Sequence, residues 1–313
     1  MEGSNRVSIN LPLLSVKGIV KKTFIYLRMM RPANIVTSVA DVLAGIAIAG
    51  VFTATVAGHW LSIVLLCCST ACLYGGGIVF NDVFDADLDR IERPERAIPS
   101  GFVSLTEATL LGAILLLTGV ILAALHSLTS GLFALAIAFF ALLYNKAGKH
   151  HSFFGPLNMG VCRGLNLLLG VSIIPAMLYT HYWLACIPVI YIFSITMTSR
   201  GEVHGGNQKN LYIAACLYVI VIGSILYFSF INQQWLWSLI FLLPFAWMIF
   251  KPLTKAIQQP IGKNIGAAVK AGVISLILMD AAWAVTFSSI YPALGIAALL
   301  PVSIWLSKIF AVT

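Results

Sequence analysis

Charged residues are scarce in this chain of 313 residues: they make up 10% of the sequence, and only 11 of them are acidic. Hydrophobic residues make up 60%, and the mean hydropathy is +0.96. Soluble domains of this size rarely combine so little charge with so much apolar surface. The composition therefore excludes an ordinary soluble domain and indicates an integral membrane protein with membrane lipids as neighbours. No feature indicates a nucleic-acid partner.

Paired cysteine spacings and a cleavable leader are also lacking. The six cysteines fall in apolar stretches without a CxxC, which argues against a disulfide framework or a metal site and predicts small buried residues. The first 30 residues lack an apolar core followed by a cleavage site. Residues 16–31 instead place bases among apolar residues at helical spacing, which predicts an interfacial amphipathic helix. We expect residues 1–32 to form a cytoplasmic or interfacial segment and residues 33–313 to form one transmembrane domain.

Long apolar stretches are abundant, and each is close to the roughly 20 residues that a helix needs to cross a bilayer. They show no alternation of the kind found in barrel strands, and lipid leaves the backbone no partner outside a helix. The sequence thus predicts an all-α polytopic bundle with nine or ten transmembrane helices. The spans are expected near residues 33–56, 60–80, 107–127, 130–145, 157–178, 182–198, 211–231, 235–250, 266–288 and 290–310.

Basic residues are missing from every second connection between these spans. The connections near Gly58, Ser127, Thr180, Gln233 and Ser289 hold no Lys or Arg, whereas the opposite ones hold nearly all of them. Such an asymmetry predicts that the N-terminus and the basic connections are cytoplasmic. The basic connections are also the long ones, so a polar site is expected to face the cytoplasm.

The stretch from Asn81 to Gly101, NDVFDADLDRIERPERAIPSG, concentrates most of the acids that the chain has. Asp82, Asp85 and Asp89 are spaced i, i+3 and i+7, which puts them on one face if the second helix continues through them. Carboxylates suit Mg²⁺, which is commonly completed by substrate phosphates, and Arg93 and Arg96 follow directly. The pattern thus suggests a diphosphate site. The alternative is a solvated acidic loop whose acids and bases pair with each other.

The motif NDxxDxxxD at the end of a second span, followed by RxxRPxRxIPSG, closely resembles the UbiA superfamily of intramembrane prenyltransferases. The resemblance implies an all-helical bundle, usually of nine spans, that transfers a prenyl group from a Mg²⁺-bound prenyl diphosphate to an aromatic or lipophilic acceptor. Two later stretches, SRGEVHGGN and VKAGVISLILMDA, look like a subgroup encoded in ebo gene clusters.

The same resemblance implies roles for further residues. Asp82, Asp85 and Asp89 would hold the metal, and Asn81 would orient an Asp or a phosphate oxygen. The residues implied to bind the diphosphate are Arg93, Arg96, Tyr144, Lys146, Lys149 and Arg163. Arg200 and Lys209 are expected to bind it too, on the basis of the loop after the sixth predicted span. Asn158 and Asn166 share a helix face, for which interhelical hydrogen bonding and ligand contact are both open.

One loop departs from the family pattern. Members commonly carry a second acidic motif after the sixth span, but the sequence there is TMTSRGEVHGGNQKN, in which Glu202 is the only acid. Glu202 is expected to join the metal ligands, while Arg200 and Lys209 supply charge that a second Mg²⁺ would have given. His204 is a further candidate as a proton carrier. The other interpretation is a non-catalytic protein that binds or exports a lipid phosphate or a prenylated intermediate.

A third hypothesis is a transporter in which Asp41, Arg163 and Asp280 act as intramembrane relay groups. It is weaker because the sequence shows no inverted repeat of broken helices. The prediction is therefore a UbiA-type prenyltransferase with its active site at the cytoplasmic face.

Overall fold

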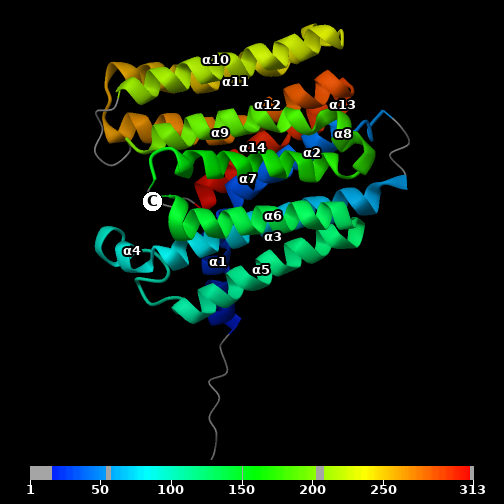
Figure 1. Ribbon diagram of the computed structural model, residues 1–313. Helices are drawn as coiled ribbons and strands as arrows, with labels where there is room; N and C mark the ends of the chain where they lie inside the picture. The colour runs from blue at the N-terminus through cyan, green and yellow to red at the C-terminus, as the bar shows by residue number, and fades with distance from the viewer. Residues whose placement is uncertain (1–15, 54–57, 150, 202–207, 311–313) are drawn as a thin grey trace, which may run out of the picture.

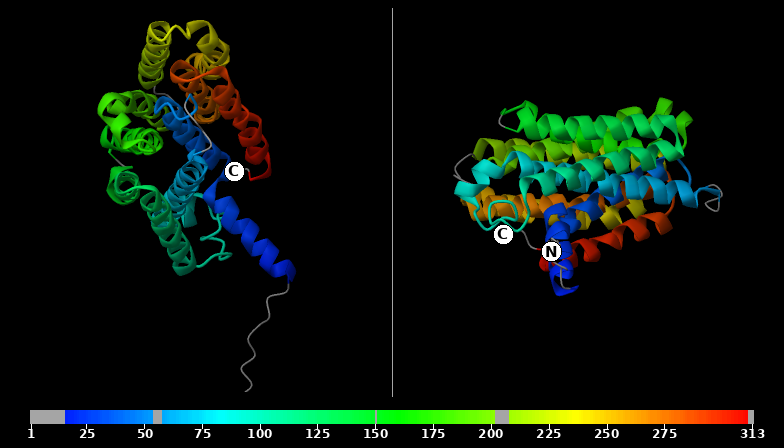
Figure 2. Two further views of the ribbon diagram at one scale, coloured as in Figure 1. Left: turned by 90° about the vertical axis from the view of Figure 1, so that its right-hand side faces the viewer. Right: turned by 90° about the horizontal axis from the view of Figure 1, so that it is seen from below.

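The computed structural model describes residues 16–53, 58–149, 151–201 and 208–310, and every regular element in these ranges is helical. The long helices lie side by side in one bundle, with the short helix α4 at one end (Figure 1). Seen along its length, the bundle has α1 projecting away from the other helices (Figure 2). The predicted all-α fold is confirmed.

The helices in chain order begin with α1 (Val16–Met30), α2 (Pro32–Ile48), α3 (Trp60–Phe84), α4 (Ala86–Glu92), α5 (Leu105–His126) and α6 (Leu128–Leu143). A π-helix (Tyr144–Gly148) precedes α7 (Phe154–Val171), and two 3₁₀ turns (Pro175–Met177 and Tyr182–Ala185) flank α8 (Leu178–His181). The rest are α9 (Cys186–Ser199), α10 (Gln208–Ile231), α11 (Trp235–Gln258), α12 (Gly262–Phe287), α13 (Ile290–Ala297) and α14 (Leu299–Ile309).

Eight helical segments of the described chain are long and apolar enough to cross a membrane, and there are nine if the bent pair α1 and α2 counts as one span. The segment Ile290–Ile309 is one of the eight, so the last predicted span is separate. The helix α7 is not among them, because Asn158, Arg163 and Asn166 lower its apolarity. The first predicted span is shorter than expected, since α2 ends at Ile48.

The break between α1 and α2 is at Arg31, which precedes a proline and has a positive φ of 52°. The two helices meet at 48° there. Pro32 has no N–H to donate, so a new helix can begin at it without losing a hydrogen bond. The predicted helix over residues 16–31 is thus present, and the domain boundary at residue 32 stays a prediction.

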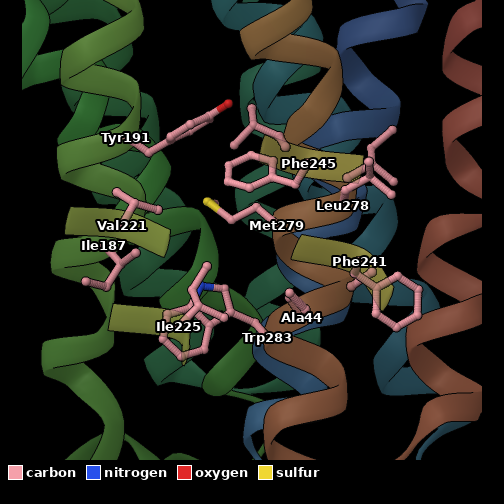
Figure 3. Packing of buried hydrophobic residues seen from close by; sticks show 14 of the residues in the cluster. Ala44, Ile187, Tyr191, Val221, Ile225, Phe241, Phe245, Leu278, Met279 and Trp283 are labelled. Atoms are coloured by element: carbon pink, nitrogen blue, oxygen red, sulfur yellow. The ribbon is translucent and has the colours of Figure 1, made fainter. Parts of the chain in front are cut away.

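The centre of the bundle is formed by α2, α7 and α12. The backbones of α2 and α7 cross closely at Gly45 and Gly170: a methyl group on Gly45 would overlap the carbonyl oxygen of Leu167, and one on Gly170 that of Val42. Small residues permit such an approach between membrane helices. Beside this crossing, Phe245, Met279 and Trp283 fill the largest apolar cluster (Figure 3).

The outer surface of the bundle is apolar, as expected of a multi-pass membrane protein. Leu117, Leu125 and Phe230, for example, are each more than half exposed. Such an extensive apolar surface would be unusual for a soluble protein. The prediction that the cysteines are buried is wrong: Cys68, Cys186 and Cys216 are exposed on the outside of their helices. In lipid, an outward apolar position suits cysteine as well as a buried one.

Candidate functional site

The acidic motif spans a helix break. The helix α3 ends at Phe84 and α4 begins at Ala86, with Asp85 in a non-helical conformation between them. The amide of Asp85 still donates to the carbonyl of Asn81 (3.0 Å), and that of Asp89 donates to the carbonyl of Asp85 (2.8 Å). The chain therefore keeps a helix-like path through the break, although the expected continuous helix is interrupted.

Each acid of the motif is paired with a base. Arg96 Nη1 lies 2.7 Å from Asp89 Oδ2 and 3.3 Å from Asp82 Oδ1. Arg31 Nη2 approaches Asp82 Oδ1 at 3.5 Å, and Lys149 forms an ion pair with Asp85. These side chains are largely buried, so the cluster is not the solvated loop of the alternative interpretation, although its acids do pair with bases.

Asp87 differs from its neighbours in the way the sequence predicts. It lies off the shared face, where its side chain is 94% exposed and pairs with Arg90 at 2.9 Å. An ion pair this exposed contributes little to stability. Asp87 therefore belongs to the surface and not to the cluster.

The described residues contain no group of three acidic, histidine or cysteine side chains positioned around one metal ion. Asp82, Asp85 and Asp89 lie at the same end of the bundle, where Arg96 and Lys149 form ion pairs with them. These two bases neutralise the negative charge that a metal ion would otherwise balance. Glu202, the fourth expected ligand, and His204 lie outside the described residues.

The connection after α6 is a π-helix, a rare element often found at functional sites. Its wide turn is closed by the amide of Lys149, which donates to the carbonyl of Tyr144 (3.0 Å). It also buries Asn145, whose amide nitrogen donates to the carbonyl of Gly77 (2.9 Å) and whose side-chain oxygen accepts from Asn81 (3.2 Å). The π-helix thus positions Lys149 against the acidic motif and couples α6 to α3.

The other residues expected to bind the diphosphate do not contact the acidic motif directly. Arg93, Lys146 and Lys209 are exposed, and no contact recorded for the described part of the chain joins them to the acids. Arg200 donates to the backbone carbonyls of Lys149 (3.2 Å) and His151. It therefore fixes the loop that carries Lys149, which is an indirect role.

Next to the acidic motif, a cavity of about 260 Å³ extends into the bundle. Asn81, Tyr144 and Arg31 lie on its wall near the motif, and its middle is largely apolar. The lining residues further include Leu73, Tyr74, Gly77, Ile78, Ile137, Ala141, Met159, Cys162, Ile192, Ile195, Val273 and Leu276. Such a cavity fits an apolar chain whose polar end lies at the motif.

The far end of the cavity is polar. Thr70 donates to Asn166 (2.6 Å), and Asn166 donates to Asp41 (2.9 Å) and to the carbonyl of Ser38 (2.9 Å). Arg163 pairs with Asp41 at 2.5 Å. Arg163 was expected at the diphosphate, and that role stays a prediction: its guanidinium lines the cavity but is paired with Asp41 in the bundle interior.

Asp280 on α12 lies beside Asp41. The three groups of the transporter hypothesis are therefore in one cluster, and one oxygen of each carboxyl group lacks a hydrogen-bond partner among the residues described. Asp41, Arg163 and Asp280 thus link α2, α7 and α12. Asn166 makes interhelical hydrogen bonds, which is one of the two roles expected for it.

Two site residues were missed by the candidate list drawn from the sequence. Arg31 contacts Asp82, and its position before a proline at the start of the first span was a visible signal. Asn145 bridges α3 and the π-helix, and only its position next to Tyr144 pointed to it. Both line the cavity.

These features define a helical membrane protein with an ion-paired acidic motif at one end of an apolar cavity. The family model of the UbiA prenyltransferase family matches residues 42–265. The chain belongs to this family, and the predicted enzyme class, a UbiA-type prenyltransferase, is confirmed.

Several relatives of this chain carry one name. A digeranylgeranylglyceryl phosphate synthase of Sulfurisphaera tokodaii is 26% identical over 243 residues, which cover 69% of this chain and 83% of that protein. The synthase of Metallosphaera sedula is 36% identical over 162 residues, 50% of this chain and 56% of that protein.

Two solved structures share the fold. One, from a study of digeranylgeranylglyceryl phosphate synthase in membranes, has a TM-score of 0.62 at 24% identity and covers 86% of this chain and 99% of its own. The other is a UbiA homologue from Aeropyrum pernix K1, with a TM-score of 0.59 at 16% identity, covering 79% of this chain and 96% of its own. At this identity the likeness concerns the fold alone.

Proposed function

We propose that this protein transfers a prenyl group from a Mg²⁺-bound prenyl diphosphate to a lipophilic acceptor, at the end of the bundle that carries α4. The observation that carries the proposal is the ion-paired motif Asp82, Asp85 and Asp89 adjoining an apolar cavity. The clustering of basic connections supports a cytoplasmic orientation for this end.

The donor set fits Mg²⁺ in its chemistry. Carboxylate oxygens are the ligands that Mg²⁺ prefers, and it usually takes one or two of them and completes its shell with water and phosphate oxygens. Asp82, Asp85 and Asp89 would hold the ion, with Glu202 as a further candidate. When bound, Mg²⁺ supplies positive charge that stabilises the departing diphosphate.

The bases that form ion pairs with these acids are also suited to bind phosphate oxygens. Arg96 bridges two acids with one guanidinium nitrogen, and an Arg can bind a phosphate oxygen pair in two parallel hydrogen bonds. We expect Arg31, Arg96 and Lys149 to turn from the carboxylates to the diphosphate when the donor binds. Arg93, Lys146 and Lys209 are exposed and would add to the positive field that attracts it.

The transfer itself requires little covalent chemistry from the protein. The bond between C1 of the prenyl group and the diphosphate oxygen breaks, and its electrons stay with the diphosphate. The acceptor's nucleophilic atom bonds to C1, and its proton leaves to the diphosphate or water. The apolar wall with Tyr74 and Tyr144 would exclude water from the allylic cation, and aromatic faces favour a nearby positive charge.

The name of the relatives supports one class of acceptor. Their name, digeranylgeranylglyceryl phosphate synthase, refers to a glycerophosphate lipid, so a hydroxyl-bearing lipid of this type is favoured over an aromatic acceptor. The test is product formation by purified protein with Mg²⁺ and geranyl diphosphate, offered either a glycerophosphate ether lipid with a free hydroxyl or an aromatic acid. Prenylation of the lipid is expected, and prenylation of the aromatic acid alone would contradict the assignment.

Variants separate transfer from mere binding. Asp82→Asn and Asp85→Asn are expected to abolish product, whereas Asp87→Asn is the matched control because Asp87 lies on the surface. If no acceptor is prenylated while Asp85-dependent binding of the donor persists, a lipid-phosphate binding protein is the better description.

A further inference from the structure

Asn145 lies where the π-helix meets α3. It is the second residue of the π-helix, and its side chain is buried, with 4% exposed. The two helices approach closely at this level, because a methyl group added to Gly77 would lie 3.4 Å from the Cβ atom of Ala141, four residues before Asn145. Small residues allow membrane helices to approach in this way. Asn145 can therefore form hydrogen bonds with the backbone of α3 as well as with its side chains.

The two hydrogen bonds of Asn145 fix the direction of its amide group. A backbone carbonyl can only accept a hydrogen bond, so the carbonyl of Gly77 requires the amide nitrogen of Asn145, which donates to it at 2.9 Å. The side-chain oxygen of Asn145 must then point the other way, where it accepts from Asn81 Nδ2 at 3.2 Å. The backbone of α3 thus determines which end of the Asn145 amide meets Asn81.

The orientation of Asn81 follows from the same rule. The oxygen of Asn145 can only accept, so Asn81 must present its amide nitrogen, and the oxygen of Asn81 is turned away from Asn145. Asn81 precedes Asp82 in the acidic motif and lines the cavity. An amide group that could rotate freely would turn either end toward the motif, and the hydrogen bond to Asn145 selects one of them.

We propose that Asn145 is a positioning residue for the transfer reaction, which holds the oxygen of Asn81 toward the metal-diphosphate site. This role rests on the proposed function. An amide oxygen can bind Mg²⁺ or accept a hydrogen bond from its bound water, whereas an amide nitrogen can do neither. Removing a side chain that orients a metal ligand typically lowers metal affinity or activity by about 10–100-fold.

The test measures binding of an unreactive thio-analogue of geranyl diphosphate with Mg²⁺, together with turnover of geranyl diphosphate, by the full chain. Asn145→Leu removes both hydrogen bonds with a side chain of the same length. It is expected to weaken binding of the analogue about tenfold or more and to lower kcat. Asn145→Ala removes the same hydrogen bonds without adding bulk, so it should have the same effect even if leucine disturbs the packing.

Asn264→Leu is the matched control. Asn264 is 6% exposed and also donates to a backbone carbonyl at 2.9 Å, that of Gln259, but it is not among the residues that line the cavity. This variant should bind the analogue like the wild type, whatever it costs in thermal unfolding. Equal losses of analogue binding in Asn145→Leu and Asn264→Leu would overturn the proposal.

A double-mutant cycle with Asn81 separates positioning from a merely structural role. If Asn145 acts through Asn81, Asn81→Ala should weaken analogue binding by a similar factor, and adding Asn145→Leu should change it by no more than about twofold. Additive losses, as expected if Asn145 acts through Lys149 instead, would refute the positioning of Asn81 even if turnover persists. Non-additive losses in analogue binding without turnover of any acceptor would support the positioning role while rejecting the proposed transferase function.

Discussion

Breaking the central ion pair should destabilise the bundle strongly. The Nε atom of Arg163 lies 2.5 Å from Asp41 Oδ2, and the two side chains are 8% and 1% exposed. Removing one partner of a buried pair costs about 3–5 kcal/mol, because the remaining charge has no compensation. Arg163→Met leaves two acids, Asp41 and Asp280, in the same interior, and taking up protons would relieve part of the cost. We therefore expect Arg163→Met to lower the free energy of unfolding by about 3 kcal/mol, the lower end of this range.

The assay is unfolding of the purified protein in detergent, with a double-mutant cycle. Arg163→Met and Asp41→Asn should each destabilise, and the double variant should lose clearly less than the sum of the two. Arg90→Met is the matched control, since its pair with Asp87 is exposed and is worth about 0–1 kcal/mol. Additive losses, or a loss for Arg163→Met no larger than for Arg90→Met, would refute the reasoning.

Three further outcomes are expected. Gly45→Ala should lower the free energy of unfolding by about 1–3 kcal/mol, because the added methyl group forces α2 away from α7. Gly223→Ala is the control and should have no such effect, since its methyl group meets no other atom; unfolding in detergent measures both. Lys149→Met removes the cation paired with Asp85, so Mg²⁺ affinity without donor should rise and donor affinity should fall in titration calorimetry; unchanged values would contradict the pairing. Ser104→Ala removes the N-cap of α5 and should cost about 1 kcal/mol in thermal unfolding, with no change in Mg²⁺ binding.

Much of the fold was predictable because lipid leaves few choices. Apolar length fixed the helices, and the break before Pro32 and the separate span Ile290–Ile309 follow from local sequence. The contacts of the polar residues in α7 could not be predicted from apolar length. Asn158 and Arg163 lower the mean hydropathy of this helix but lie inside the bundle, and only tertiary packing shows what they contact.

The sequence singled out the acidic motif, but it did not show which side chains contact it. The spacing of Asp82, Asp85 and Asp89 identified the motif, but it gave no information on which bases would lie against them. Arg163 illustrates the limit: a basic residue near the cytoplasmic end of a span looks like a ligand for an anion, and its true partner, Asp41, is 122 positions away in the sequence. Such long-range pairing depends on how α2 and α7 cross.

The most direct test of the account is the affinity of Mg²⁺ with and without a bound donor. Purified protein would be titrated with Mg²⁺ alone and then in the presence of the unreactive geranyl analogue. We expect weak binding alone, because Arg96 and Lys149 already neutralise the acids, and binding about tenfold or more tighter with the analogue. Asp85→Asn should abolish the tight binding and Asp87→Asn should retain it. Equal Mg²⁺ affinity with and without the analogue, or tight binding that survives Asp85→Asn, would contradict a metal-diphosphate site at this motif.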